Sequence, residues 1–385
     1  MSRVAVRPEL VQWARERAGL TENQLIARFP RLVDWESGAV RPTFRQLEDF
    51  ARATHVPLGY LFLPEPPEIR LPIRDFRTVQ NRRMGTVSPD LLDTIYTMQR
   101  RQAWLREDQL DVGAEPLAFV GSARLSDDPR AIGREMRRIT GLANGWAAEV
   151  RSWREAVRLL REGIEGLGVM AVINGVVGNN TSRVLSVEEF RGFALSDQYA
   201  PLIFVNGADS KSAQMFTLAH ELAHIWLGET GEGISGFPGI FPDGGEVESF
   251  CDRAAAEFLV PEAELRALWP EVRRKAQPFE TLARRFKVSP IVTGRRAMDL
   301  QLTGRDEFFS FYNAYTAQER QKKKSAGRGD FYKNQNTRVG RMFATRVIHA
   351  AREGRIGFKQ AYDLTGLNAG TFQEYAHRIG IDLPK

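Results

Sequence analysis

The stretch FTLAHELAHIWLG, residues 216–228, holds two of the five histidines in a chain of 385 residues. His220 and His224 are four positions apart, and Glu221 directly follows the first of them. Small and apolar residues surround the three, and a glycine follows, which predicts a helix over residues 212–227. Because positions i and i+4 lie on one face of a helix, the two imidazole rings can reach the same ion.

This spacing is typical of a zinc site. Two imidazoles at i and i+4 can hold Zn²⁺ through ring nitrogens at about 2.0–2.1 Å. Glu221 lies about 100° round the helix from His220, so it can act as general base on a water molecule at the metal without being a ligand. We therefore expect Zn²⁺ as cofactor, His220 and His224 as ligands and Glu221 as the catalytic base. The alternative is a pair of ordinary helix-face histidines.

A catalytic zinc needs a third protein ligand and one open position. The stretch GGEVESFCDRAAAEFLVP, residues 244–261, supplies the candidates. Glu248 and Asp252 share a helix face, so we expect Glu248 on the metal and Asp252 behind it, bonded to a histidine Nδ1–H. Glu246 and Glu257 are rival ligands, but Glu257 lies about 180° round the helix from Glu248. A solvated acid at a helix start is the alternative role for Glu248.

The composition limits the classes of protein to which this chain can belong. Hydrophobic content is 43% and charged content 26%, which is ordinary for a globular chain. Cys251 is the one cysteine, so no intrachain disulfide can form, and no signal-peptide or membrane-spanning stretch is present in the sequence. We expect a cytoplasmic protein that does not bind membranes. Net charge is +6, and residues 305–385 carry 15 Lys and Arg against 8 Asp and Glu, which permits nucleic-acid contact without requiring it.

The pattern of elements predicts an α+β fold. We expect an N-terminal helical module, a central unit with a small sheet, and a C-terminal helical domain. Outside residues 212–227, the predicted helices are 88–112, 127–140, 148–164 and 246–259. The predicted strands are 166–175, 189–197 and 200–207. Strand 200–207 is either an edge that binds substrate backbone or a core strand. The glycine-rich loop 228–245 is either a lid or a plain connection.

The two stretches around the histidines and acids resemble the ImmA/IrrE family of zinc metallo-endopeptidases. The resemblance covers the strand PLIFVN, the motif FTLAHELAH, and ESFCDRAAAEFLVP. It implies a zincin-like fold with His220, His224 and Glu248 as ligands and Glu221 as base. This chain has Cys251, Asp252 and Ala254 where the family usually has Ala, Asn and Phe. None of these departures removes a ligand or the base.

The N-terminus, from ARERAGLTENQLIARF to LFLPEPP, resembles the XRE-type helix-turn-helix that often precedes this peptidase. Capping boxes at Thr21–Gln24 and Thr43–Gln46 support short helices. The candidate recognition segment is about four residues shorter than the usual pattern. The candidates for binding DNA or a partner are arginines at four positions: Arg28, Arg31, Arg41 and Arg45. Docking of a partner protein is the competing role. A second helix–glycine turn–helix, FKQAYDLTGLNAGTFQEYAHRIG, lies near the C-terminus, either as a DNA reader or as a packing domain.

These observations predict four domains and one main function. The ranges are 1–64 (helix-turn-helix), 65–126 (proline-rich linker and helical connector), 127–304 (metallopeptidase) and 305–385 (basic linker and C-terminal helical domain). The resemblance implies an endopeptidase that cleaves a specific partner protein, a helix-turn-helix repressor, and so controls gene expression. The alternative is a DNA-binding regulator or antitoxin with weak or no proteolysis. DNA is a further candidate partner, and a homo-oligomer is compatible with the sequence.

Overall fold

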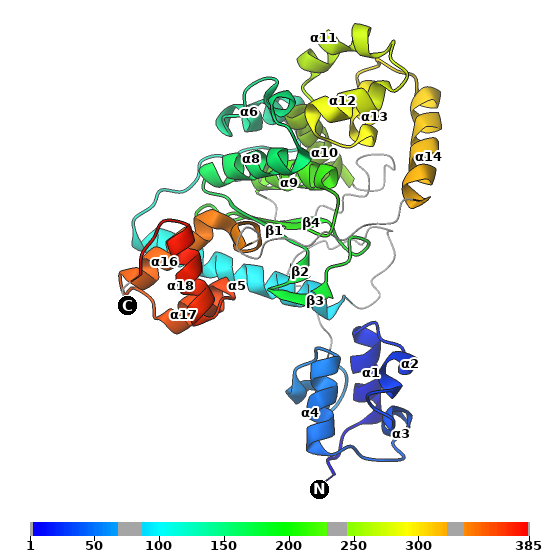
Figure 1. Ribbon diagram of the computed structural model, residues 1–385, viewed down its shortest axis with the longest axis vertical. Coiled ribbons are helices and arrows are strands. Elements are labelled where there is room, and N and C mark those ends of the chain that lie inside the picture. The colour runs from blue at the N-terminus through cyan, green and yellow to red at the C-terminus, as the bar shows by residue number, and fades with distance from the viewer. Residues whose placement is uncertain (1–2, 68–86, 229–244, 322–334, 384–385) are drawn as a thin grey trace. The chain divides into compact units, whose positions relative to one another are not determined.

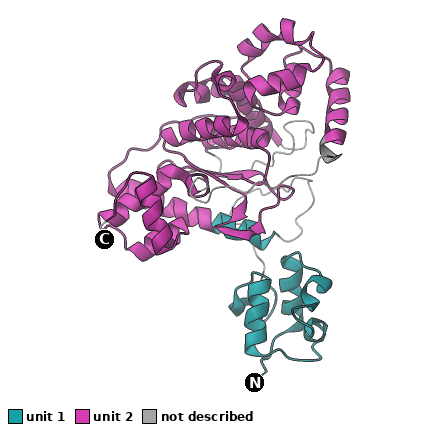
Figure 2. Ribbon diagram, in the orientation of Figure 1, with its two compact units in different colours: residues 1–72, 82–96 teal, residues 73–81, 97–385 magenta. Residues whose placement is uncertain are grey.

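The computed structural model describes residues 3–67, 87–228, 245–321 and 335–383 (Figure 1). The chain divides into two compact units, residues 1–72 with 82–96 and residues 73–81 with 97–385 (Figure 2). The first is helical and the second combines helices with a small sheet, in agreement with the predicted α+β class. The four predicted domain ranges stay a prediction.

The first unit is a bundle of short helices around an aromatic core. Its elements are α1 (Pro8–Arg17), α2 (Glu22–Ile26), α3 (Leu32–Glu36), α4 (Phe44–Ala53) and the 3₁₀ helix η1 (Leu58–Phe62). Phe29, Trp35 and Phe50 are buried and pack edge-on or tilted against one another at 5.5–6.2 Å between ring centroids. The Thr43 hydroxyl accepts the Gln46 N–H, and the Gln46 side chain accepts the Thr43 N–H, which is the predicted capping box.

The main sheet of the second unit has three strands in the order β1-β5-β4. β1 (Met170–Asn174) and β5 (Leu202–Asn206) are parallel, and β4 (Gly192–Leu195) is antiparallel to β5. All three strands were predicted. β5 is the central strand, so of the two roles left open for strand 200–207 the substrate-binding edge is wrong and the core strand is confirmed. Among the described residues, β1 and β4 are the two edges of this sheet. A separate hairpin, β2 (Val176–Val177) and β3 (Asn180–Val184), was not predicted.

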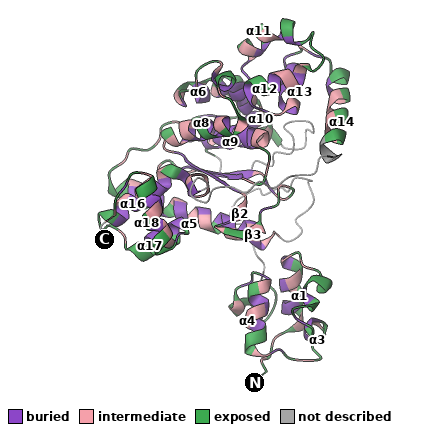
Figure 3. Cartoon of the chain, viewed as in Figure 1, coloured by how far each residue is buried: buried purple, intermediate pink, exposed green. Residues whose placement is uncertain are grey.

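Every residue of β1, β4 and β5 is buried, because helices cover both faces of the sheet (Figures 1 and 3). Helices α8 (Trp153–Gly166) and α9 (Lys211–Leu227) cover one face. Helix α5 (Pro89–Asp111), from Thr97 onward, lies on the other face, where Gln102 donates hydrogen bonds to the carbonyls of Leu195 and Ala200. Burial on two faces explains why MAVIN, GFAL and LIFVN are continuous apolar runs up to the asparagines that end β1 and β5.

Helix α10 (Gly245–Leu259) crosses α6 (Pro129–Ile139) at very short range. A Cβ atom at Gly133 of α6 would stand 2.5 Å from the Ala254 carbonyl oxygen, so glycine is required at the crossing. Ala254 is itself fully buried there, which accounts for a small residue where the resembled family has Phe. Several further helices had no separate range in the prediction. The short helix α7 (Trp146–Glu149) lies between α6 and α8 in the chain. The others follow α10, and they are α11 (Glu262–Val272), α12 (Pro278–Phe286), α13 (Pro290–Asp299) and α14 (Arg305–Gln321).

The C-terminal helices pack against the rest of the second unit. They are the π-helix η3 (Asn336–Gly340), α16 (Arg341–Arg352), α17 (Phe358–Thr365) and α18 (Ala369–Arg378). The fully enclosed Arg101 of α5 donates to the Leu364 carbonyl at 2.9 Å and to the Arg338 carbonyl at 3.2 Å. Asp108, also on α5, forms ion pairs with Arg346 and Arg355.

Some predicted features lie outside the described residues. They include most of the proline-rich linker, the basic linker after residue 321 and the glycine-rich loop, of which only residues 228 and 245 are described. Within the described part of the chain, no helix combines the length and apolarity that a bilayer crossing requires.

Candidate metal centre

Helix α9 carries the two histidines and the acid between them into the interior. The Ser210 hydroxyl accepts the Ala213 N–H at its start, and Gly228 ends it in the left-handed conformation (φ 71°). His220, Glu221 and His224 are each at most 1% exposed. The helix packs on β4 and β5 and against α8 and α10, which fixes its rotation. The predicted helix over residues 212–227 therefore has the buried histidine face that a metal centre requires.

Helix α10 brings two carboxylates to the histidines. Glu248 Oε2 lies 3.1 Å from His220 Nε2, and Glu248 Oε1 lies 3.4 Å from His224 Nε2. The two Nε2 atoms are 3.1 Å apart. On the other side of the His220 ring, Asp252 Oδ1 lies 2.9 Å from Nδ1. Glu248 therefore faces both Nε2 atoms, and Asp252, one turn further along α10, contacts the Nδ1 atom of the His220 ring.

The donor set fits a zinc ion. One ligand atom from each of His220, His224 and Glu248 lies within 4.8 Å of the others. Ligands about 2.0–2.1 Å from a tetrahedral zinc are about 3.3 Å from one another. The separations of 3.1, 3.1 and 3.4 Å agree with this value. Asp252 accepting the Nδ1–H of His220 leaves the Nε2 lone pair directed to the centre, which is the tautomer that a ligand needs.

The two carboxylates of the cluster also favour a positive charge between the ligand atoms. Burial lowers the pKa of His220, but hydrogen bonds with Asp252 and Glu248 outweigh it and hold the pKa well above its usual value. Burial likewise raises the pKa of Glu248, yet hydrogen bonds from both histidines outweigh it and hold the pKa below its usual range. Burial is the main cause that lowers the pKa of His224. Two carboxylates around buried imidazoles therefore favour either a proton or a divalent cation between them.

Glu221 occupies a separate position, next to β4. A Cβ atom at Gly192 would stand 3.2 Å from Glu221 Oε1 and 2.5 Å from the Thr217 methyl carbon. Gly192 therefore leaves the space in which the Glu221 carboxylate lies. Gly192 was not among the predicted site residues. The available signal was a glycine inside a predicted strand, which often marks a close approach.

The rival acids lie elsewhere. Glu257 is 3% exposed and forms a buried ion pair with Arg296 of α13, on the side of α10 away from the histidines. Glu246 is exposed and is not in the ligand group. Cys251, one turn from Glu248, is fully buried among apolar residues of the core. Of the acids weighed from the sequence, the structure brings Glu248 and Asp252 to the histidines.

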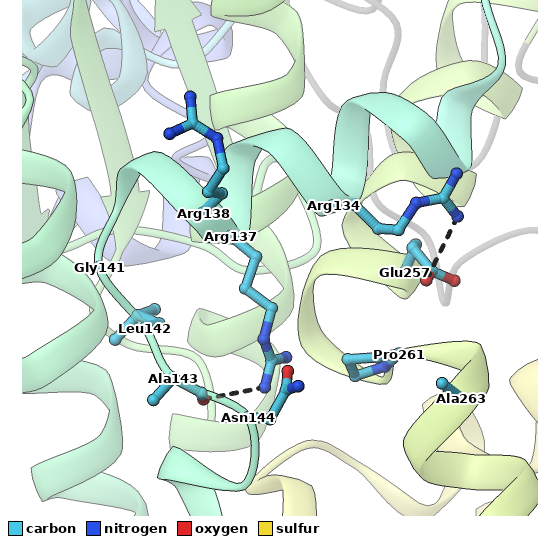
Figure 4. Close-up of a pocket in the computed structure, with 10 residues that line it drawn as sticks. All are labelled: Arg134, Arg137, Arg138, Gly141, Leu142, Ala143, Asn144, Glu257, Pro261 and Ala263. Carbon is cyan, nitrogen blue, oxygen red and sulfur yellow. Dashed lines mark hydrogen bonds and ion pairs between the residues drawn. The ribbon is translucent and has the colours of Figure 1, made fainter.

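A pocket of about 520 Å³ lies at the far end of α10, between α6 and the start of α11 (Figure 4). Arg137 crosses it and donates to the carbonyls of Phe258 and Ala143 and to Glu264. Glu257 lines the opposite wall, within ion-pair distance of Arg134. None of the metal-centre residues lines this pocket, so it is distinct from the candidate site.

The arginines proposed to bind DNA or a partner are on the first unit. Arg28, Arg31, Arg41 and Arg45 are all exposed. Within the described residues none of them forms an ion pair, and the Arg28 guanidinium lies over the Phe29 ring at 5.4 Å. The exposure of these four arginines is compatible with contact to either DNA or an acidic protein surface.

Comparison with family models adds an independent observation. Residues 181–298 match the model of the IrrE N-terminal-like domain, which belongs to the M78 peptidases. The matched range contains β4, β5, α9 and α10, and with them every residue of the metal cluster. A second match, to a domain of unknown function, covers residues 339–378. No curated protein matches the chain. The similarity indicates a metallopeptidase-like function for this part of the chain.

Proposed function

We propose that this chain is a zinc-dependent endopeptidase, with His220, His224 and Glu248 as ligands and Glu221 as general base. The observation that carries the proposal is the convergence of three ligand atoms at separations that fit a tetrahedral zinc, whose fourth position substrate and water would take. A structural zinc would be expected to have four protein ligands, often cysteines. Cys251 is the one cysteine of the chain and is not part of the cluster.

Zinc, when bound, supplies a Lewis acid that polarises the scissile carbonyl and lowers the pKa of water at its open position. The protein residues do the rest. Asp252 keeps the His220 ring in the correct tautomer and orientation. Glu221 accepts a proton from the attacking water and delivers it to the amine that leaves. One water is consumed, the peptide C–N bond breaks, and a carboxylate and an amine are released.

The substrate of this reaction is a specific partner protein, and we propose a helix-turn-helix repressor whose cleavage changes gene expression. The proposal rests on the resemblance of the site and on the helical first unit, whose exposed arginines suit contact with another regulatory protein or its DNA. DNA binding with little or no proteolysis is the competing function. The intact base at Glu221 favours proteolysis, because a protein that only binds has no use for it.

The decisive experiment compares wild-type protein with Glu221→Gln. Zinc content is measured by mass spectrometry, and cleavage is followed with candidate repressors encoded next to the gene. We expect equal zinc in both proteins and cleavage by the wild type alone, because Gln keeps the size of the side chain but cannot take the proton. Equal cleavage by both proteins, or a wild type that cannot be loaded with zinc, would refute the proposal.

A further inference from the structure

The last three helices have the geometry of a DNA-reading module. Helix α17 ends at Thr365, the three residues Gly366, Leu367 and Asn368 form the turn, and α18 begins at Ala369. Gly366 is in the left-handed conformation (φ 69°), and the Asn368 side chain accepts the N–H of Thr371. Two helices joined by a three-residue turn that contains glycine form a helix-turn-helix.

A compact core fixes this arrangement. Tyr362 of α17 packs edge-on against Phe372 of α18, with ring centroids 5.3 Å apart. Leu367 in the turn is 4% exposed, which ties the turn to the core. Further buried residues come from α16, α17 and α18, among them Phe343, Ala344, Val347, Ile348, Ala361, Leu364, Tyr375 and Ala376. The three helices therefore form one small cluster (Figure 1).

The outer face of α18 is exposed and carries two polar side chains, Gln373 and His377, the second of which pairs with the Asp382 carboxylate at 3.0 Å. It consists of Ala369, Gly370, Gln373 and His377, all exposed and spaced so that 370, 373 and 377 form one stripe. The first two residues are small, which allows close approach at the start of the helix. No acid precedes Glu374 on α18, and Glu374 is paired with Arg378. In a helix-turn-helix the first residues of the second helix contact base edges, and a Gln side chain suits adenine.

The charge of the cluster suits a phosphate backbone. Residues 336–383 carry seven Lys and Arg against four Asp and Glu. Lys359, the second residue of α17, is exposed, and among the described residues it forms no ion pair. The first helix of a helix-turn-helix crosses the DNA backbone, which is the position of Lys359. Arg352, at the end of α16, is likewise exposed.

The rest of the second unit supports the turn from behind. Asn179, between β2 and β3, donates to the Gly366 carbonyl at 2.8 Å. Arg101 of α5 donates to the Leu364 carbonyl at 2.9 Å. These contacts hold the end of α17 and do not involve the outer face of α18. The pair is therefore positioned before any ligand arrives.

The N-terminal candidate is less suited to the same task. Helix α3, which would be its reading helix, has five residues and a length of about 7.5 Å, against about 15 Å for the ten residues of α18. It also carries Asp34 and Glu36, which would lie among phosphates. Glu36 is already bonded to Arg15.

We propose that α17 and α18 bind duplex DNA, with the outer face of α18 in the major groove and Lys359 on the phosphate backbone. This function is assigned to the C-terminal helices, not to α2 and α3. It does not depend on peptidase activity, so it stands or falls separately from the proposed function.

The test uses the full-length protein and fluorescently labelled duplexes. Preferred sequences are first selected from a random 20-base-pair library at low salt, and affinity is then measured by fluorescence anisotropy at several salt concentrations. The variants are Gln373→Ala, Lys359→Ala and, as matched control elsewhere on the second unit, Arg285→Ala on α12. All these side chains are exposed, and circular dichroism verifies folding.

We expect Gln373→Ala to weaken binding to the selected duplex by roughly five- to a hundredfold and to leave random duplex almost unaffected. Lys359→Ala weakens binding to all duplexes and reduces the salt slope by about 1. The arginine control binds as the wild type does. The proposal is overturned if the full chain binds no duplex at low salt. It is also overturned if the two C-terminal variants bind like the wild type, or if the control alone loses binding.

Discussion

The crossing of α6 and α10 offers a sharp test, because a single methyl group should disturb it. In Gly133→Ala the new Cβ atom would stand 2.5 Å from the Ala254 carbonyl oxygen, 2.9 Å from Glu257 Cβ and 3.1 Å from the Phe258 nitrogen. Ordinary contact begins at 3.4 Å, so the closest pair falls short by 0.9 Å. Two of these atoms are backbone atoms, which cannot rotate away. One of the two helices must therefore move by nearly that distance.

The energy of this change is the difference between two effects. Replacing glycine by alanine inside a helix favours folding by about 0.5–1 kcal/mol. Overpacking at a rigid contact costs about 1–3 kcal/mol. We expect a net loss, with a melting temperature lower by a few degrees. Because Ala254 is two residues after Asp252 on the same helix, the displacement should also weaken zinc binding.

The control is Gly166→Ala on α8. No heavy atom lies within 4 Å of the position of its Cβ, and its φ is not in the left-handed region. This variant should be unchanged or more stable by up to about 1 kcal/mol. Thermal unfolding of metal-free protein and competition with a zinc chelator measure both effects. If Gly133→Ala is as stable as the control and binds zinc normally, α6 and α10 do not approach each other as closely as described.

Three further changes probe the site and its surroundings. Asp252→Ala should weaken zinc binding by roughly 10–100-fold, because the Nδ1–H of His220 loses its acceptor, and Asp252→Asn should have an intermediate effect. Competition with a chelator measures the zinc affinity, and an unchanged affinity would contradict this role of Asp252. Gly192→Ala should lower the rate of peptide cleavage more than zinc content. Its methyl group would stand 2.5 Å from the Thr217 methyl carbon, 2.8 Å from the Phe204 carbonyl oxygen and 3.2 Å from Glu221 Oε1, and would so disturb the surroundings of the Glu221 carboxylate; equal losses in both would refute this role. Burial raises the pKa of Glu165 to about 7, from a usual 4.5. The folded state therefore loses stability as pH rises from 4.5 to 7, on the order of 3 kcal/mol. In Glu165→Gln the buried Arg161 guanidinium loses its ion-pair partner at every pH, so the variant is judged by its pH dependence. Its melting temperature relative to wild type should rise between pH 4.5 and 8, and a constant difference across that range would exclude this cause.

The sequence predicted much of the candidate site because its signals are local. The spacing of His220 and His224 is meaningful within one helix turn, and so is that of Glu248 and Asp252. The angle argument that set Glu257 aside agrees with its burial against Arg296. What joins the two helices is not local, and neither is the close approach of Gly192 to Glu221. Gly192 and Glu221 are 29 positions apart in the chain, and a single sequence gives no signal of such a contact.

Strand order and helix packing were harder to predict. LIFVN is apolar up to its last residue, Asn206, which is equally compatible with a central strand and with an edge covered by other residues. The hairpin β2–β3 lacks an alternating apolar pattern, since four of the five residues of β3 are exposed. The C-terminal helices themselves were predicted, including the glycine turn between them. Their attachment through Arg101 and Asp108 involves partners more than 200 residues away.

The attachment of the last helices through Arg101 has a practical consequence for genetic work. A deletion allele that ends before residue 335 would leave a guanidinium without its carbonyl acceptors and the Asp108 carboxylate without its two arginines. The remaining protein would then be prone to misfolding and degradation. Loss of peptidase activity in such an allele would say little about what the deleted helices do, whereas surface point variants keep the two questions apart.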